Sequence, residues 1–343
     1  MVALPARSDL SPPAKADPAP LAWVLHDGKA GMASQALGLA EATGFPFIEK
    51  SLAVRAPWAW LPPQFWLAPL VAVSDGGLPL RPPWPELVIG CGRNTAAPAL
   101  AIKRASGGRT VAAQVQDPRA GHNEFDLMLV PEHDRYRGPR VIVTQGALHR
   151  VTPEKLAAAR GFFPELTALR RPILGVLIGG SNRAYRLPLD RLASIADAIA
   201  RAVRETGGSA VVTPSRRTGE EGVALLRERL AGISATVWDM TGDNPYFAYL
   251  ALADAFLVTA DSVSMISETA ATGKPVHIIE LEGGDAKFAR FHQAMREAGI
   301  TRPFTGRIES WRYAPLDDTA RAGAALRALV LDRLATDAAV GAG

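Results

Sequence analysis

Residues 254–275 read DAFLVTADSVSMISETAATGKP, which combines a short strand, a polar turn and a short helix in direct succession. The apolar run 255–259 has the length and composition of a buried strand. Ser262 or Ser264 can cap the helix that follows, because a serine hydroxyl accepts a hydrogen bond from an otherwise unpaired backbone N–H group. A Gly-Lys-Pro stop ends that helix, and residues 276–280 are predicted to form a second buried strand.

The same turn has the chemistry of a ligand site. Unpaired N–H groups at the start of a helix attract anions. Ser264 and Glu268 are four residues apart, so they share one face of the helix at the carboxyl end of the strand, where open α/β sheets bind ligands. A carboxylate there can accept hydrogen bonds from both hydroxyls of a ribose. An ordinary capped βαβ turn without a ligand is the alternative.

The composition is that of a globular protein with two domains. The chain has 343 residues, of which 48% are hydrophobic and 21% charged, and this length typically forms two domains. No window approaches the roughly 20 apolar residues that a spanning helix needs. Residues 1–20 lack the continuous apolar core of a secretory signal, so we expect a disordered leader there.

Cysteine content and charge limit the compartment and the class of ligand. The only cysteine, Cys91, excludes an internal disulfide and a cysteine-rich metal site, and it fits a reducing cytoplasm. We therefore expect no metal and no bound cofactor. The formal net charge is +4, with 38 basic residues interspersed among 34 acidic ones. This pattern favours anionic small molecules or lipid headgroups over nucleic acid as partners.

Short apolar runs alternate with segments of helical periodicity along almost the whole chain, which is typical of parallel sheets covered by helices. We expect two such sheets, with a boundary near residues 150–172. The predicted strands are residues 21–25, 87–90, 110–114, 127–130 and 141–143, then 173–178, 210–213, 236–238, 255–259 and 276–280. The predicted helices are residues 33–43, 96–106, 189–206 and 220–230. The predicted domains are 21–155 and 172–310, followed by a C-terminal helix and tail in 311–343.

Each half has a glycine-bearing loop directly after its first strand. Residues 27–31 read DGKAG and residues 179–183 read GGSNR. Glycine lets the backbone approach a ligand closely, and a helix that starts after such a loop favours phosphate. Neither loop matches G-x-G-x-x-G or G-x-x-x-x-G-K-[S/T], which disfavours a nicotinamide cofactor and an ordinary ATPase. The turn at residues 90–95, GCGRNT, is a further cleft candidate.

Seven stretches together resemble the bacterial branch of the elongated-mitochondria fission-factor family. They are residues 26–31 (HDGKAG), 35–40 (QALGLA), 116–119 (QDPR), 179–181 (GGS), 213–218 (TPSRRT), 243–246 (DNPY) and 259–268 (TADSVSMISE). The resemblance implies a fold like that of the GT-B glycosyltransferases, in which two Rossmann-like domains with parallel sheets face each other across a cleft. The second half is also similar to the donor half of the peptidoglycan N-acetylglucosaminyltransferase, at Gly179, Gly180, Ser181 and Glu268.

This resemblance implies a site for a nucleotide-diphosphate sugar at the carboxyl end of the second sheet. Backbone N–H groups of Ser181 and Asn182 would face the phosphates, with Arg183 beside them. Arg216 would supply a second cation, because a guanidinium group pairs bidentately with phosphate oxygens. Glu268 would bind the ribose. The residues that would line the diphosphate and the sugar are Ser262, Val263, Ser264 and Met265. For each arginine, a solvated loop charge is the alternative.

A transferase of this type needs a base that takes the proton of the acceptor hydroxyl, and the opposite domain usually supplies it. His26 and Asp27, at the end of the first strand, are the first candidates. Asp117 and His122, after the third strand, come next. A turn-forming role explains Asp27 equally well, because Asp-Gly pairs often form turns.

Residues 56–85 contain four of the seven tryptophans, Trp58, Trp60, Trp66 and Trp84. Tryptophan prefers the surface of a bilayer, so this segment is a candidate for membrane contact and for access to a lipid-linked acceptor. A covering loop packed on the first domain is the alternative.

Three functions fit these observations. The first is a metal-independent glycosyltransferase that moves a hexosyl or N-acetylhexosaminyl group from a nucleotide sugar to an envelope saccharide or a lipid-linked acceptor. The second is a nucleotide-sugar epimerase of the same fold, and the third is a non-catalytic sensor or recruitment protein. We expect a cytoplasmic protein, with peripheral contact at the inner membrane as an open alternative.

Overall fold

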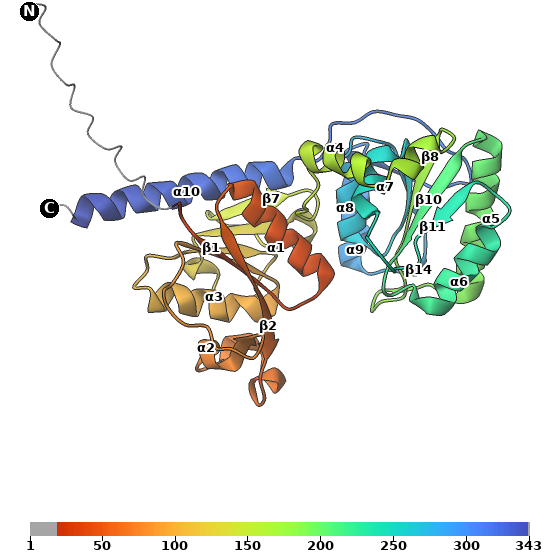
Figure 1. Ribbon diagram of the computed structural model, residues 1–343. Helices are drawn as coiled ribbons and strands as arrows, with labels where there is room; N and C mark the ends of the chain where they lie inside the picture. Colours follow the sequence, from red (N-terminus) through yellow and green to blue (C-terminus); the bar gives the residue numbers. More distant parts are fainter. Residues whose placement is uncertain (1–18, 342–343) are drawn as a thin grey trace, which may run out of the picture.

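The computed structural model describes residues 19–341, which form two α/β domains side by side (Figure 1). Most of the predicted leader, residues 1–18, lies outside the described residues. Within residues 19–341, no helix combines the length and the apolar character that crossing a bilayer requires. The two parallel sheets and the GT-B-like arrangement predicted above are confirmed.

The first domain is built on a seven-stranded sheet in the order β3-β2-β1-β4-β5-β6-β7. Its strands are β1 (Ala22–His26), β2 (Phe47–Val54), β3 (Val73–Asp75), β4 (Leu87–Cys91), β5 (Val111–Val115), β6 (Leu127–Pro131) and β7 (Val141–Thr144). Helix α1 (Ala30–Thr43) packs on one face and α3 (Arg93–Ala105) on the other. Strands β1, β4 and β5 are buried along their whole length, as expected for central strands of a parallel sheet.

The second domain is built on a six-stranded sheet in the order β11-β10-β8-β12-β13-β15, and all its pairs are parallel. Its strands are β8 (Ile173–Ile178), β10 (Ser209–Pro214), β11 (Ala235–Val237), β12 (Ala255–Thr259), β13 (Val276–Ile279) and β15 (Thr301–Pro303). Its helices are α5 (Leu189–Thr206), α6 (Gly219–Leu230), α7 (Tyr246–Leu252), α8 (Val263–Ala270) and α9 (Ala286–Glu297), and α4 (Pro153–Phe162) precedes the first strand. A short antiparallel pair, β9 (Tyr185–Arg186) with β14 (Glu282–Gly283), lies beside the sheet.

The first sheet adds an antiparallel edge strand to the predicted parallel strands. Strands β2 and β3 were not predicted, and β3 runs antiparallel to β2 at the edge of the sheet. Strand β2 reads FIEKSLAV and is exposed over half of its length, so it lacks the continuous apolar run by which the central strands were recognised. The short edge strand β15 was also missed, because three residues carry too little pattern.

The last helix, α10 (Asp318–Gly341), returns from the second domain to the first (Figure 1). Its side chains Ala322, Leu326 and Val330 are buried in the core beneath β1, β4 and β5. Gly323 lets α10 lie directly on α1, since a Cβ atom at this position would be 2.4 Å from Cβ of Ala42. The first domain is therefore assembled from two separate segments of the chain.

The two segments that cross between the domains meet at the start of α10. The N–H groups of Gln145 and Gly146 donate to Asp318 Oδ2, at 2.8 and 3.1 Å. The N–H group of His149 donates to the Thr319 hydroxyl at 3.0 Å. These bonds hold together the two segments by which the chain passes between the domains.

Both sheets reverse their direction of winding at one strand. In the first, the chain moves from β1 outward through β2 and then places β4 on the other side of β1. In the second, it moves from β8 through β10 to β11 and then places β12 on the other side of β8. Such topological switch points are where open α/β sheets bind ligands, at the carboxyl ends of the strands.

Candidate functional site

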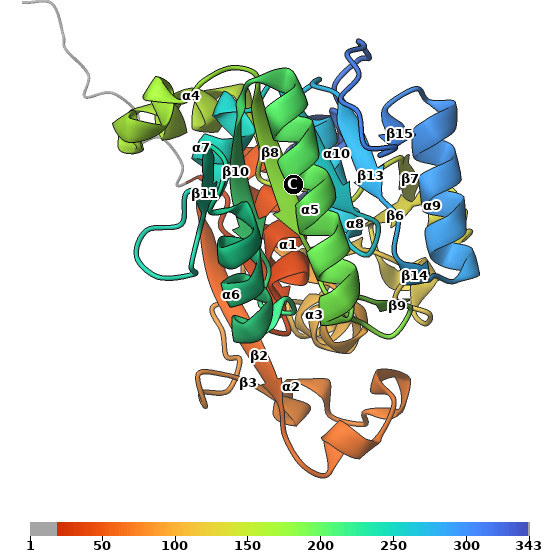
Figure 2. The ribbon, with the colours of Figure 1, turned by 90° about the vertical axis from the view of Figure 1, so that its right-hand side faces the viewer.

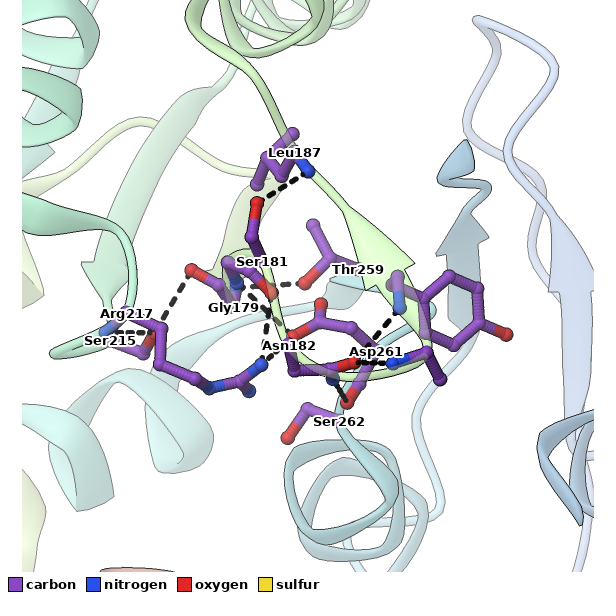
Figure 3. Close-up of polar contacts among 12 residues, drawn as sticks. Gly179, Ser181, Asn182, Leu187, Ser215, Arg217, Thr259, Asp261 and Ser262 are labelled. Atoms are coloured by element: carbon purple, nitrogen blue, oxygen red, sulfur yellow. Dashed lines mark hydrogen bonds and ion pairs between the residues drawn. The ribbon is translucent and has the colours of Figure 1, made fainter. Parts of the chain in front are cut away.

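The second switch point is centred on the buried carboxylate of Asp261, two residues after β12 (Figure 3). Asp261 Oδ2 accepts the N–H group of Gly180 at 3.1 Å and pairs with Arg217 Nη1 at 2.6 Å. The Thr259 hydroxyl accepts the N–H group of Gly179 at 2.8 Å. These contacts fix the loop after β8 against the loop after β12.

Two glycines are required at this point because there is no room for a side chain. A Cβ atom at Gly179 would lie 2.1 Å from Asp261 Oδ2, and one at Gly180 would lie 2.4 Å from the carbonyl oxygen of Arg217. The hydroxyl of Ser215 donates to the carbonyl oxygen of Gly179 at 2.9 Å. The loops after β8, β10 and β12 therefore form one compact unit.

Part of the Arg217 guanidinium group at the edge of this unit remains available to a ligand. The Arg217 guanidinium uses Nη1 for Asp261 and for the carbonyl oxygen of Gly180, while its Nε and Nη2 atoms make no hydrogen bond within residues 19–341. Asp261 Oδ1 is buried and has no partner in the same range. The side chain of Ser262 caps α8 by accepting the N–H group of Met265 at 3.3 Å, as predicted. A partly exposed cation thus stands beside the amino end of α8.

Glu268 lies one turn further along α8 and reaches the other domain. Its Oε2 atom accepts the hydroxyl of Tyr246 from α7, and its Oε1 atom accepts the hydroxyl of Ser34 from α1 at 3.3 Å. Burial raises the pKa of the Glu268 carboxyl to about 7, although both hydrogen bonds act in the opposite direction. Burial beside this carboxylate also raises the pKa of the Tyr246 hydroxyl.

The helices that begin at the two switch points, α1 and α8, lie in contact with each other. A Cβ atom at Gly31, in the first turn of α1, would lie 3.2 Å from the hydroxyl of Ser264 in the first turn of α8. Away from this contact, Arg290 on α9 donates to the carbonyl oxygen of His133 at 2.9 Å, and Lys287 pairs with Asp134 at 2.6 Å. The two domains therefore touch both at α8 and at α9.

The loop after β8 differs in part from its predicted form. The N–H group of Asn182 donates to the carbonyl oxygen of Tyr185 at 2.9 Å, so it is already used within a turn. The Ser181 hydroxyl accepts the N–H group of Leu187 at 2.9 Å. Helix α5 begins at Leu189, as predicted, and the short strand β9 separates it from this loop. The helix start at this switch point is that of α8.

Arg183 and Arg216, the two predicted phosphate cations, are both exposed on loops at the carboxyl end of the sheet. The neighbour of Arg216, Arg217, is the arginine that contacts the buried Asp261. Neither Asp261 nor Arg217 was singled out from the sequence. The available signal was an aspartate two residues beyond a wholly apolar strand, but its arginine partner lies 44 residues earlier and could not be identified without the strand order.

The first switch point contains two of the predicted catalytic residues. His26 is buried, and the N–H group of Gly28 donates to its Nδ1 atom at 3.1 Å, so the Nε2–H group donates to Glu49 Oε1, at 2.7 Å. Both ring nitrogens are therefore occupied. Asp27 pairs with Lys29 through Oδ2, and its Oδ1 atom has no partner among the described residues. Asp27 is thus the more available of the two.

Asp117 and His122 form a pair on the loop after β5. The His122 Nε2 atom lies 2.8 Å from Asp117 Oδ1, which also accepts the N–H group of Arg119 at 2.7 Å. The imidazole ring stacks on Tyr136, with ring centroids 4.0 Å apart. If Nε2 donates to the carboxylate, Nδ1 is left as a proton acceptor. The structure thus joins two residues that the sequence analysis proposed side by side.

Comparison with known proteins adds a family and a fold. The family model described as Mitochondrial fission ELM1 matches residues 30–330. The Mitochondrial fission protein ELM1 of Arabidopsis thaliana is 35% identical over an alignment of 271 residues, and the match covers 71% of this chain and 63% of the plant protein. An uncharacterized protein of Rickettsia prowazekii is 26% identical over an alignment of 277 residues, and the match covers 68% of this chain and 77% of that protein.

Among solved structures, UDP-GlcNAc 2-epimerase from Methanocaldococcus jannaschii has a similar fold. The superposition has a TM-score of 0.55 and covers 91% of this chain and 99% of the epimerase. The sequence identity is 12%, so the likeness concerns the fold alone.

Proposed function

Because the chain belongs to the Mitochondrial fission ELM1 family and has a GT-B-like fold, we propose that it binds a nucleotide-diphosphate sugar between its domains and transfers the sugar without a metal ion. One observation carries the proposal. At the second switch point, a cation with free N–H groups (Arg217) and a carboxylate (Glu268) stand near the first two turns of α8. A cation binds the charged diphosphate, and a carboxylate accepts hydrogen bonds from the hydroxyl groups of a ribose.

The donor would bind with its diphosphate at the amino end of α8. There the Arg217 guanidinium and the helix dipole favour negative charge. The Ser181 N–H group and the exposed Arg183 and Arg216 are further candidates for the phosphates. The ribose hydroxyls would donate to Glu268 in place of Ser34. The side chains that would line the diphosphate and the sugar are Ser262, Val263, Ser264 and Met265.

Transfer requires one bond to form and one to break. The acceptor hydroxyl oxygen attacks the anomeric carbon, the bond from that carbon to the diphosphate breaks, and a base takes the proton of the hydroxyl. Arg217 and the α8 dipole would stabilise the charge that develops on the leaving diphosphate. Asp27, or His122 held by Asp117, would take the proton. The acceptor is a saccharide or a lipid-linked group that enters from the first domain.

Thermal-shift measurements with UDP, GDP, CMP and their sugar conjugates test the donor site. A nucleotide at roughly 100 times its dissociation constant should stabilise the native protein by about 2.7 kcal/mol. We expect Arg217→Lys to weaken this stabilisation and Arg217→Ala to abolish it. The matched control is Arg229→Ala, because Arg229 pairs with Asp197 at 3.1 Å between the outer helices α5 and α6. It should respond to nucleotides like the wild type.

Two results would contradict the proposal. If no nucleotide stabilises the wild type, the donor site does not exist. If a nucleotide binds but incubation of the sugar nucleotide with acceptor extracts gives no new glycoside, transfer is wrong while binding stands. A changed sugar nucleotide in that experiment would instead identify an epimerase.

A further inference from the structure

Exposed apolar side chains gather on one projection of the first domain. Ten large hydrophobic side chains are exposed among the described residues, and six of them fall between residues 60 and 78. They are 44% to 93% exposed, and we call them the apolar crest: Trp60, Leu61, Phe65, Leu67, Val71 and Leu78. A concentration of this kind on a monomer marks an interaction surface.

The crest is held in place from beneath. Trp66 is buried, and its indole N–H group lies 3.0 Å from the carbonyl oxygens of both Trp58 and Leu61. Ala72 and Val73 belong to the buried core beneath α3. Buried residues of the same segment therefore fix the backbone that carries the exposed side chains, and the fold itself keeps these side chains exposed.

The crest projects from the side of the first domain where the parallel strands have their carboxyl ends, which is the side where a sheet of this type binds its ligand. It follows the carboxyl end of β2 and returns through β3, so it lies beyond the carboxyl ends of the parallel strands. Figure 2 shows this orange segment extending below both sheets. A pocket of about 160 Å³ lies between its base and α3. Its lining includes Trp66, Pro69, Arg93, Leu100, Arg104 and Pro118.

The charges around the crest favour a lipid surface over a protein. The only acidic residue between positions 55 and 85 is Asp75, which is engaged by Lys50 at 3.3 Å and by the N–H group of Ser51 at 3.1 Å. Arg55 and Arg81 flank the segment. Tryptophan and leucine with neighbouring arginines suit the boundary between headgroups and acyl chains.

We propose that the apolar crest inserts into the surface of an anionic lipid bilayer. Trp60, Leu67 and their neighbours enter the boundary region, while Arg55 and Arg81 stay with the headgroups. When the crest is inserted, the pocket beneath it, which Arg93 helps to line, lies at the membrane surface. The consequence for the acceptor rests on the proposed function: the acceptor is an amphiphile anchored in the same bilayer, with its polar end in that pocket.

Vesicle flotation tests the docking. Phosphatidylcholine vesicles with phosphatidylglycerol should carry the wild type, and vesicles without it should carry less. We expect the double variant Trp60→Glu/Leu67→Glu to reduce the bound fraction at least about tenfold. The matched control is Phe162→Glu, since Phe162 is 76% exposed on α4, outside the crest. It should float like the wild type.

The outcomes separate this proposal from the donor site. A wild type that stays in the aqueous fraction with both vesicles overturns the docking, as does equal loss in the crest and control variants. If the crest variant instead abolishes a dimer of the wild type and no vesicle binds, the crest is a protein interface. Stabilisation by nucleotide is measured on the same proteins, and it should be equal in all three. Its absence would contradict the proposed function while leaving the docking intact.

Discussion

The Glu268 carboxyl group makes the stability of this protein depend on pH. Its pKa is about 7 in the native protein, against an ordinary value of 4.5, because the group is buried. Between these two pH values the native state binds more protons than the unfolded chain. The free energy of unfolding therefore decreases as the pH rises through this window, by up to about 3 kcal/mol, and changes no further from this group above it.

Glu268→Gln should remove this dependence, because the amide is neutral and keeps an oxygen for the Tyr246 hydroxyl. We expect the variant to match the wild type near pH 4.5 and to exceed its stability above pH 7, while it loses the proposed nucleotide binding. Urea unfolding at the two pH values measures the difference. Equal destabilisation at both would contradict the assigned pKa and show that the acid itself is needed for the fold.

At the scale of single residues, the sequence identifies what is local. Gly179 and Gly180 were singled out because they directly follow a recognisable strand, and Glu268 because it lies on the short helix that follows another. Arg217 and Ser34 were not found, since their importance arises from contacts across three loops or across the two domains. Spacing along the chain carries no information about such contacts before the strand order is known.

The loop after β8 depends on its glycines as an element. Alanine at Gly180 would press against the carbonyl oxygen of Arg217, and backbone cannot swing away as a flexible side chain can. We expect Gly180→Ala to lower the free energy of unfolding by about 1–3 kcal/mol and to abolish nucleotide-dependent stabilisation. Urea titration with and without nucleotide measures both effects.

Gly161→Ala is the matched control, because Gly161 lies in α4 and a Cβ atom there would meet nothing within 4 Å. Alanine favours a helix over glycine, so this variant should be as stable as the wild type or more so. If both variants behave alike, the close approach at Gly180 does not constrain the loop.

Among the elements, those buried on both faces were the ones predicted well. Strands β8 and β12 match their predicted bounds, because the uninterrupted runs ILGVLI and AFLVT have no exposed position. Strand β2 was not predicted because glutamate and serine at exposed positions and a partly buried lysine interrupt its apolar residues. Strand β2 lies next to the edge strand β3 and pairs with its neighbours through the backbone, and that pairing leaves little trace in the side chains.

At the scale of the whole molecule, α10 completes the core of the first domain. Leu326 is 0% exposed, whereas Leu331 on the same helix is 43% exposed. We expect Leu326→Ala to lower the free energy of unfolding by about 2–5 kcal/mol. Leu331→Ala should change it by no more than about 0.5 kcal/mol.

Tryptophan fluorescence during urea unfolding reports on this domain, since five of the seven tryptophans precede residue 85. Equal stability of the two variants would show that the buried side chain of Leu326 on α10 does not stabilise the domain. The sequence predicts a helix within residues 311–343 but does not indicate which domain this helix covers. Its small apolar side chains fit either sheet.

The position of α10 reverses the order in which the domains can mature during synthesis. The strands of the first domain leave the ribosome first, yet the helix that seals their core is translated only after the complete second domain. The domain made last can fold first, while the domain made first waits with an open apolar face. We therefore expect a chaperone that binds nascent chains to bind the amino-terminal half of this protein.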